Sequence, residues 1–138
     1  MGIISKKEGI EHIDTNIVIR LIVGDDPKNY KKAKKLMAQK HKTFVFEDSA
    51  MMEVVFILSK IYKYSRKEVV AGIDIISKFD NIYFNKGLIE DALNIYVNHP
   101  KLSFVDCYLV AITNITQEKP LWTFDKKLLA QCPLAKEP

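Results

Sequence analysis

Apolar and polar residues alternate along the chain in a way that divides it into short β-rich and helical segments. Short apolar runs predict strands at residues 10–14, 43–46, 81–84 and 121–124. Longer segments predict helices at residues 15–23, 28–41, from about 49 to about 62, 66–79, 87–98, 103–115 and 125–131. The pattern therefore places a helix between each strand and the next.

Helix signals support several of these boundaries. Gly24 is suited to end the first helix, and Asp26 followed by Pro27 is typical of a helix start. Ser65 with Glu68 forms a capping box at the start of the 66–79 helix. Residues 28–41 place apolar side chains on one face and lysines on the other, which is the pattern of an amphipathic helix. The helix at 103–115 is so apolar that we expect it to be buried.

Strands that alternate with helices indicate a parallel sheet covered on both faces. We therefore expect an α/β protein, built as a three-layer α/β/α sandwich around a central four- to five-stranded parallel sheet. The 138 residues fit a single domain spanning residues 1–138. Little sequence remains after Pro133 for a fifth strand. In such sheets, functional sites form at the carboxyl ends of the strands.

The amino-acid composition indicates a folded domain and argues against enzymes that bind nucleotides through a glycine-rich loop. The chain is 48% hydrophobic and 28% charged, which is typical of a folded domain. Its five glycines are scattered, so no glycine-rich phosphate loop can be built from them.

Cys107 and Cys132 have no metal-ligand spacing and are expected to be reduced core thiols. Residues 1–7 lack the apolar core of a signal peptide, and Lys6 does not fit a myristoylation start. The apolar runs are too short to cross a bilayer, so we expect a cytoplasmic protein.

Four carboxylates have unusual sequence surroundings. Asp14 and Asp125 follow predicted strands, whereas Glu53 and Asp106 interrupt otherwise apolar predicted helices. An unpaired carboxylate in an apolar setting is costly, and the chain has only two arginines to pair with. A divalent cation is the simpler counter-charge. Carboxylate clusters suit Mg²⁺ or Mn²⁺, whereas the three histidines lack the spacing of a zinc site.

Each carboxylate also has a structural interpretation. Asp14 and Asp125 are suited to be helix N-caps. Glu53 could belong to an exposed helix stripe with Lys60. The sequence around Asp106 provides no polar helix face that could carry it, so for this residue a functional role is favoured over a structural one.

The ordered motifs resemble the PIN-domain family, and within it the VapC-type toxins of type II toxin–antitoxin pairs. The resemblance runs from about residue 13 to residue 129 and rests on Asp14-Thr15-Asn16, Glu53 in an apolar helix, Ser103-Phe104-Val105-Asp106, and Thr123-Phe124-Asp125. It implies a ribonuclease that uses Mg²⁺ or Mn²⁺, acts on RNA, forms a homodimer and is bound by an antitoxin protein. It also implies a catalytic, metal-holding set with two supporting polar residues: Asp14, Glu53, Asp106 and Asp125, supported by Asn16 and Thr123.

One position departs from the family pattern. Many relatives carry an acidic residue three positions before the third carboxylate, where this chain has Ser103. The departure weakens the case for a second metal ion.

Positive charge is concentrated in one segment. Residues 28–42 contain seven lysines and no acidic residue, although the whole chain carries a formal charge of only +4. Lys31, Lys32 and Lys35 are candidate RNA contacts. The alternative is an ordinary solvated helix face, because charge runs usually only solvate. Tyr30 is the only aromatic residue among these lysines, so a base-stacking platform is not indicated.

Two other functions fit parts of the pattern. A non-catalytic RNA- or protein-binding module of the same fold is the main alternative, and the intact acidic set argues against it. A phospho-acceptor receiver domain is also a small parallel α/β unit. It would need an acidic pair after the first strand, and Asp14 is followed by Thr15 and Asn16 instead.

Overall fold

Two compact units divide the computed structural model: unit 1 is Met1–Lys86 and unit 2 is Gly87–Pro138. The structure describes residues 9–117 and 119–138. The prediction that residues 1–7 carry no signal peptide lies outside the described residues. The two units are described one at a time below.

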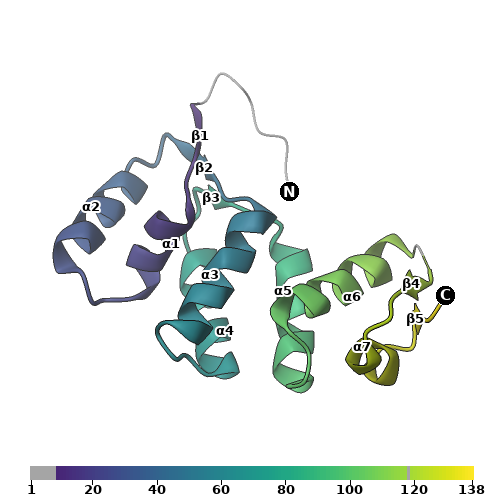
Figure 1. Ribbon diagram of the computed structural model, residues 1–138. Coiled ribbons are helices and arrows are strands. Elements are labelled where there is room, and N and C mark those ends of the chain that lie inside the picture. Colours follow the sequence, from purple (N-terminus) through teal and green to yellow (C-terminus); the bar gives the residue numbers. More distant parts are fainter. Residues whose placement is uncertain (1–8, 118) are drawn as a thin grey trace. The chain divides into compact units, whose positions relative to one another are not determined.

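Unit 1 contains a three-stranded parallel sheet with the strand order β1-β2-β3. In the register of this sheet, Glu11 of β1 lies opposite Phe44 of β2, and Phe44 lies opposite Ile82 of β3. The elements, labelled in Figure 1, are β1 (Ile10–His12), α1 (Thr15–Ile22), α2 (Pro27–Met37), β2 (Thr43–Val45), α3 (Asp48–Lys60), α4 (Arg66–Ser77) and β3 (Ile82–Tyr83).

Unit 2 contains a second, two-stranded parallel sheet. Its elements are α5 (Lys86–Asn98), which begins at the last residue of unit 1, α6 (Phe104–Thr116), β4 (Leu121–Trp122), α7 (Lys126–Gln131) and β5 (Ala135–Lys136) (Figure 1). The sequence left open whether a fifth strand forms after Cys132, and β5 forms there. Two residues are enough for it, because the Leu121 and Thr123 N–H groups donate to the carbonyls of Leu134 and Lys136.

The predicted α/β class, with parallel strands interleaved with helices, is confirmed. The strands number five and are divided into sheets of three and two. The predicted strands were longer than the observed ones, because the residues at their ends serve as helix caps or turns. Asp14, for example, was placed in the first strand, but it is the N-cap of α1.

Helix ends follow local hydrogen bonding. Asp26 caps α2 and Ser65 forms the predicted capping box with Glu68. The N–H of Ser65 donates to the Glu68 carboxylate and thereby lowers the pKa of that side chain. One expected cap is wrong, because α1 ends at Ile22 and is followed by an extended residue, not by a left-handed Gly24. The N-cap of α3 is Glu47.

The core of unit 1 forms where α1 packs against α2, α3 and α4. Gly72 of α4 permits a close approach, because a Cβ atom built on it would lie 2.9 Å from Cγ2 of Ile22. The fully buried side chains of unit 1 are mainly aliphatic and aromatic: Val18, Ile19, Met37, Phe44, Phe46, Met51, Val54, Leu58, Val69 and Ile76.

In unit 2 the helix α6 is buried along only one face, which carries Phe104, Cys107 and Ala111. Its opposite face exposes Val105, Leu109 and Ile115, so the expected complete burial of this helix is wrong. The apolar composition of α6 gave no sign of which face would be covered. In β4, Trp122 is 59% exposed.

Both cysteines are free and buried, as expected for reduced core thiols. In the described part of the chain, no helix combines the length and apolar character needed to span a membrane.

Candidate metal-binding site

Asp14 lies at the carboxyl end of β1 and caps the helix that follows. Its Oδ1 accepts hydrogen bonds from the N–H groups of Asn16 and Ile17, at 3.1 and 3.3 Å. The structural interpretation of Asp14 as an N-cap is therefore confirmed. One carboxylate oxygen satisfies the helix start, and Oδ2 has no hydrogen-bond partner among the described residues.

Glu53 of α3 is joined to this position through Thr15. The Thr15 hydroxyl donates to Oε2 of Glu53 at 3.1 Å and connects residues 38 positions apart. Thr15 is buried, whereas Glu53 is exposed. Because Thr15 directly follows Asp14, this bond brings the start of α1 and the Glu53 carboxylate together. Thr15 was not predicted as a site residue, because its contact with Glu53 joins positions far apart in the sequence.

Asn16 contributes through its backbone. Its N–H donates to Asp14, and its amide side chain makes no hydrogen bond within the described ranges. The predicted supporting role of that side chain stays a prediction.

Asp106 lies in the first turn of α6 in unit 2 and is half-buried. It forms a capping box with Ser103: Oδ2 of Asp106 accepts from the Ser103 N–H at 3.3 Å, and the Ser103 hydroxyl accepts from the Asp106 N–H at 3.2 Å. Ser103, the position that departs from the family pattern, is therefore the N-cap of α6. Asp106 was expected to lack a polar neighbour, and this is wrong, because the Ser103 backbone supplies one.

Asp125 is the N-cap of α7. Its Oδ1 accepts from the N–H groups of Lys127 and Leu128, at 2.8 and 3.3 Å. Thr123 supports this position, because its hydroxyl accepts from the Asp125 N–H at 2.9 Å. The N-cap interpretation of Asp125 is confirmed.

The four carboxylates share one feature. Each uses one oxygen in a local hydrogen bond and leaves the other without a partner among the residues that the structure describes. Asp14, Glu53 and Asp125 are exposed, so the expectation of apolar surroundings is wrong for them. Asp14 and Asp125 are exposed at helix starts, and Glu53 is exposed within α3, even where the neighbouring sequence is apolar.

Asp14 and Glu53 belong to unit 1, and Asp106 and Asp125 belong to unit 2. Within the described ranges, no three Asp, Glu, His or Cys side chains group into a metal site. The donor set fits a hard cation by its chemistry, because each member offers a carboxylate oxygen that is held in place through its other oxygen.

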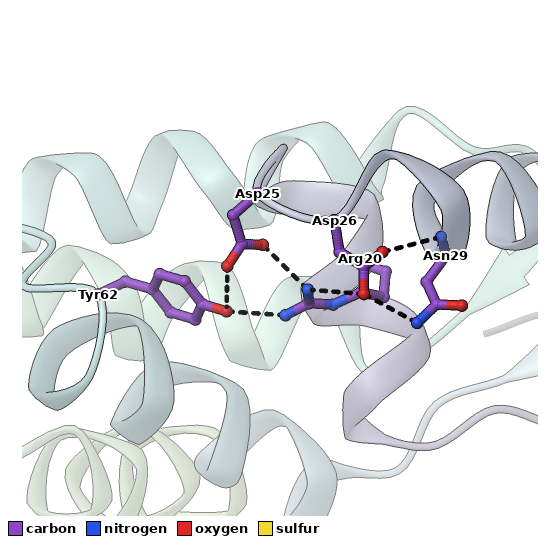
Figure 2. A network of polar contacts seen from close by, with 5 residues as sticks. All are labelled: Arg20, Asp25, Asp26, Asn29 and Tyr62. Atoms are coloured by element: carbon purple, nitrogen blue, oxygen red, sulfur yellow. Dashed lines mark hydrogen bonds and ion pairs between the residues drawn. The ribbon is translucent and has the colours of Figure 1, made fainter.

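A second polar network fixes the far end of α1 (Figure 2). Arg20 donates to Asp25 at 2.9 Å and to the Tyr62 hydroxyl at 2.7 Å, and that hydroxyl donates to Asp25 at 3.0 Å. The hydrogen bond to Tyr62 raises the pKa of Arg20. Nearby, the Asn29 N–H lowers the pKa of Asp26. The helix α1 is thus tied to α3 by Thr15–Glu53 and to the segment after α3 by Arg20–Tyr62.

The lysines of α2 are exposed. In the described part of the chain, Lys31, Lys32 and Lys35 make no ion pair or hydrogen bond. Lys34 instead lies over the Phe79 ring, 5.4 Å from its centroid. The surface can therefore accept an anion, and the solvated-face alternative stays open.

The PIN domain family model matches residues 12–132, which include all four carboxylates and nearly the whole chain. The chain belongs to the PIN domain family. PIN domains are typically metal-dependent nucleases, and they generally use Mg²⁺ or Mn²⁺. The resemblance expected from the motifs is confirmed at the level of the family.

Among solved structures, the chain is similar to the crystal structure of Mycobacterium tuberculosis VapC20, described as a Sarcin-Ricin loop cleaving toxin. The two share 22% sequence identity, and the match covers 90% of this chain and 96% of the other, with a TM-score of 0.40. At this sequence identity and TM-score the similarity is distant. No curated protein sequence matches this chain.

Proposed function

We propose that this PIN domain is an endoribonuclease that hydrolyses RNA phosphodiester bonds with Mg²⁺ or Mn²⁺. The observation that carries the proposal is the shared geometry of the four acids, each of which has one oxygen fixed by a hydrogen bond and one oxygen left to bind a cation. Membership of a family of metal-dependent nucleases supports it.

Asp14, Glu53, Asp106 and Asp125 would together hold the cation. When bound, such a cation polarises a phosphoryl oxygen and lowers the pKa of a coordinated water. The protein's part is to fix the carboxylates. Thr15 holds Glu53 beside the start of α1, and the capping bonds of Asp106 and Asp125 direct one oxygen of each toward its own helix.

The biological setting is part of the same proposal. The motifs resemble those of VapC-type toxins, so we infer a cytoplasmic toxin that acts on RNA, forms a homodimer and is restrained by a cognate antitoxin protein. The homodimer and the antitoxin rest on the family resemblance.

The test is cleavage of a panel of RNAs of varied sequence and secondary structure, with added Mg²⁺ or Mn²⁺ and with excess chelator. We expect cleavage only with the metal. Asp91→Asn is a matched control, because Asp91 is an exposed carboxylate of α5 outside the proposed set. Cleavage that persists in chelator would contradict the metal role. RNA binding without any cleavage across the panel would instead favour the non-catalytic binding module.

A further inference from the structure

Unit 2 contains a pocket of about 400 Å³ between two segments that are distant in sequence. One segment is the connection from α5 to α6, and the other is α7. The lining residues are Pro100, Lys101, Lys126, Lys127, Ala130 and Gln131. All six belong to unit 2, so the pocket is a feature of that unit alone.

The pocket brings three positive charges together. Lys101, Lys126 and Lys127 are exposed, and none of them makes an ion pair within residues 9–117 and 119–138. No acidic side chain lines the pocket. Like charges gathered without a counter-charge repel one another, and a bound anion relieves that repulsion. The pocket is therefore suited to an anionic group.

The same two segments carry both carboxylates of unit 2. Lys126 and Lys127 directly follow Asp125, and the Lys127 N–H donates to the Asp125 carboxylate. Lys101 lies two positions before Ser103, the capping partner of Asp106. An anion in the pocket would therefore lie against the segments that hold half of the proposed metal ligands.

We propose that this lysine pocket binds a backbone phosphate of the RNA and positions the strand for cleavage. The inference rests on the proposed function, because it assigns the RNA to that same site. Lysine ammonium groups act on phosphates as point charges, so the contact fixes the position of the strand without selecting its sequence. Selection of the RNA target must come from other contacts.

The lysines of α2 offer a weaker candidate for the same role. They come from one helix, and none of them lines a described pocket. The lysine pocket instead combines charges from two segments and has walls formed by Pro100 and Ala130. We therefore expect the pocket to contribute more binding per lysine than the α2 surface.

The experiment measures binding of a fluorescent 12-nucleotide single-stranded RNA of mixed sequence by the full chain in excess chelator, over a series of salt concentrations. The test variant is the triple substitution Lys101→Gln, Lys126→Gln and Lys127→Gln. The matched control removes three exposed lysines of unit 1, Lys60→Gln, Lys63→Gln and Lys67→Gln, with the same change in net charge.

We expect the pocket variant to bind at least about tenfold more weakly at 0.1 M salt, with its log–log salt slope reduced by about 0.7, because one phosphate contact to a single strand contributes about that much to the slope. The control should keep most of the wild-type affinity. The corresponding triple arginine variant should also keep it, because arginine preserves the charge.

Unchanged RNA affinity in the pocket variant would overturn the proposal, and so would an equal loss in pocket and control variants, which would show that net charge alone matters. If the triple variant does not fold, as judged by far-UV circular dichroism, Lys101→Gln alone supplies the test, with weaker binding than wild type and a slope decrease of less than about 0.7. Binding in chelator is independent of cleavage. Pocket-dependent binding without nuclease activity would therefore overturn the proposed function and not the pocket.

Discussion

The two units hold their candidate carboxylates in different ways. In unit 1, the Thr15 hydroxyl connects the position after Asp14 to Glu53 across 38 residues of sequence. In unit 2, Asp106 and Asp125 are each fixed only within the first turn of their own helix. The first arrangement depends on the packing of α1 against α3, whereas the second is set locally. The two halves of the proposed site should therefore respond differently to mutation.

The largest effect is expected from removing one carboxylate charge in either unit. We expect Asp14→Asn and Asp106→Asn each to lower RNA cleavage at least about a hundredfold, because an amide oxygen binds a divalent cation poorly and one charge-stabilising contact commonly contributes that much. Both variants should stay folded, since asparagine is an accepted N-cap residue at position 14, and at position 106 its amide oxygen can still accept from the Ser103 N–H. Cleavage rates and far-UV circular dichroism check this, with Asp91→Asn as the control. Wild-type cleavage by Asp106→Asn would remove Asp106 from the site.

A smaller effect is expected from the link in unit 1. Thr15→Val keeps the shape of the side chain and loses the hydroxyl, so we expect about 1 kcal/mol less stability and roughly tenfold slower cleavage. Thr15→Ser keeps the hydroxyl and should retain most of the activity. Denaturant unfolding and cleavage rates measure both quantities. If Thr15→Val cleaved RNA as fast as wild type, Thr15 would be a packing residue only.

In unit 2 the matching change is at Ser103. We expect Ser103→Ala to destabilise the start of α6 by about 1 kcal/mol, because the Asp106 N–H loses its capping partner. Ser103→Asp should preserve the cap and also supply the acidic residue that many family members carry there. Hydrogen exchange of the first-turn amides of α6 reports the change. If Ser103→Ala also made hydrogen exchange faster in unit 1, the effect of the Ser103 cap would extend beyond α6.

The capping motifs show how much the sequence could predict. The predictions for Ser65 with Glu68 and for Asp26 with Pro27 are confirmed, because an N-cap is a local interaction between residues two or three positions apart. The Ser103–Asp106 box is just as local and has the same three-residue spacing, but it was not predicted. The family could be inferred because its motifs occur in a fixed order along the chain.

Long-range contacts could not be predicted in the same way. Nothing in the sequence indicates that Thr15 donates to Glu53 or that Arg20 pairs with Tyr62, because these contacts depend on how helices pack. The convergence of Lys101 with Lys126 and Lys127 on one pocket is of the same kind. The strand β5 was underestimated because two residues are enough to pair with β4.

The smallest predicted effect is the loss of stability on lowering the pH that comes from two capping carboxylates of unit 1. The pKa of Asp26 and of Glu68 is lowered in the folded state, by the N–H groups of Asn29 and Ser65 respectively. Their stabilisation is therefore present above the unfolded-state pKa, near pH 4, and is lost as the pH falls through the folded-state pKa. The double variant Asp26→Asn, Glu68→Gln keeps both caps and removes both charges.

Melting temperatures of wild type and this double variant, measured from pH 6 down to pH 3, test the prediction. We expect a modestly lower melting temperature for the variant at pH 6 and a smaller difference at pH 3, because the wild-type carboxylates become protonated as the pH falls. A difference that stays constant over this range would show that the charges of these two side chains do not contribute.

Direct binding of Mn²⁺, followed by electron paramagnetic resonance of the free ion, tests whether carboxylates of both units hold one cation. The titration compares wild type with Asp14→Asn, Glu53→Gln, Asp106→Asn, Asp125→Asn and the Asp91→Asn control. We predict that each of the four site variants weakens Mn²⁺ binding at least about tenfold and that the control binds as wild type does. Wild-type affinity in both unit 2 variants, with loss only in the unit 1 variants, would contradict a cation shared by all four carboxylates.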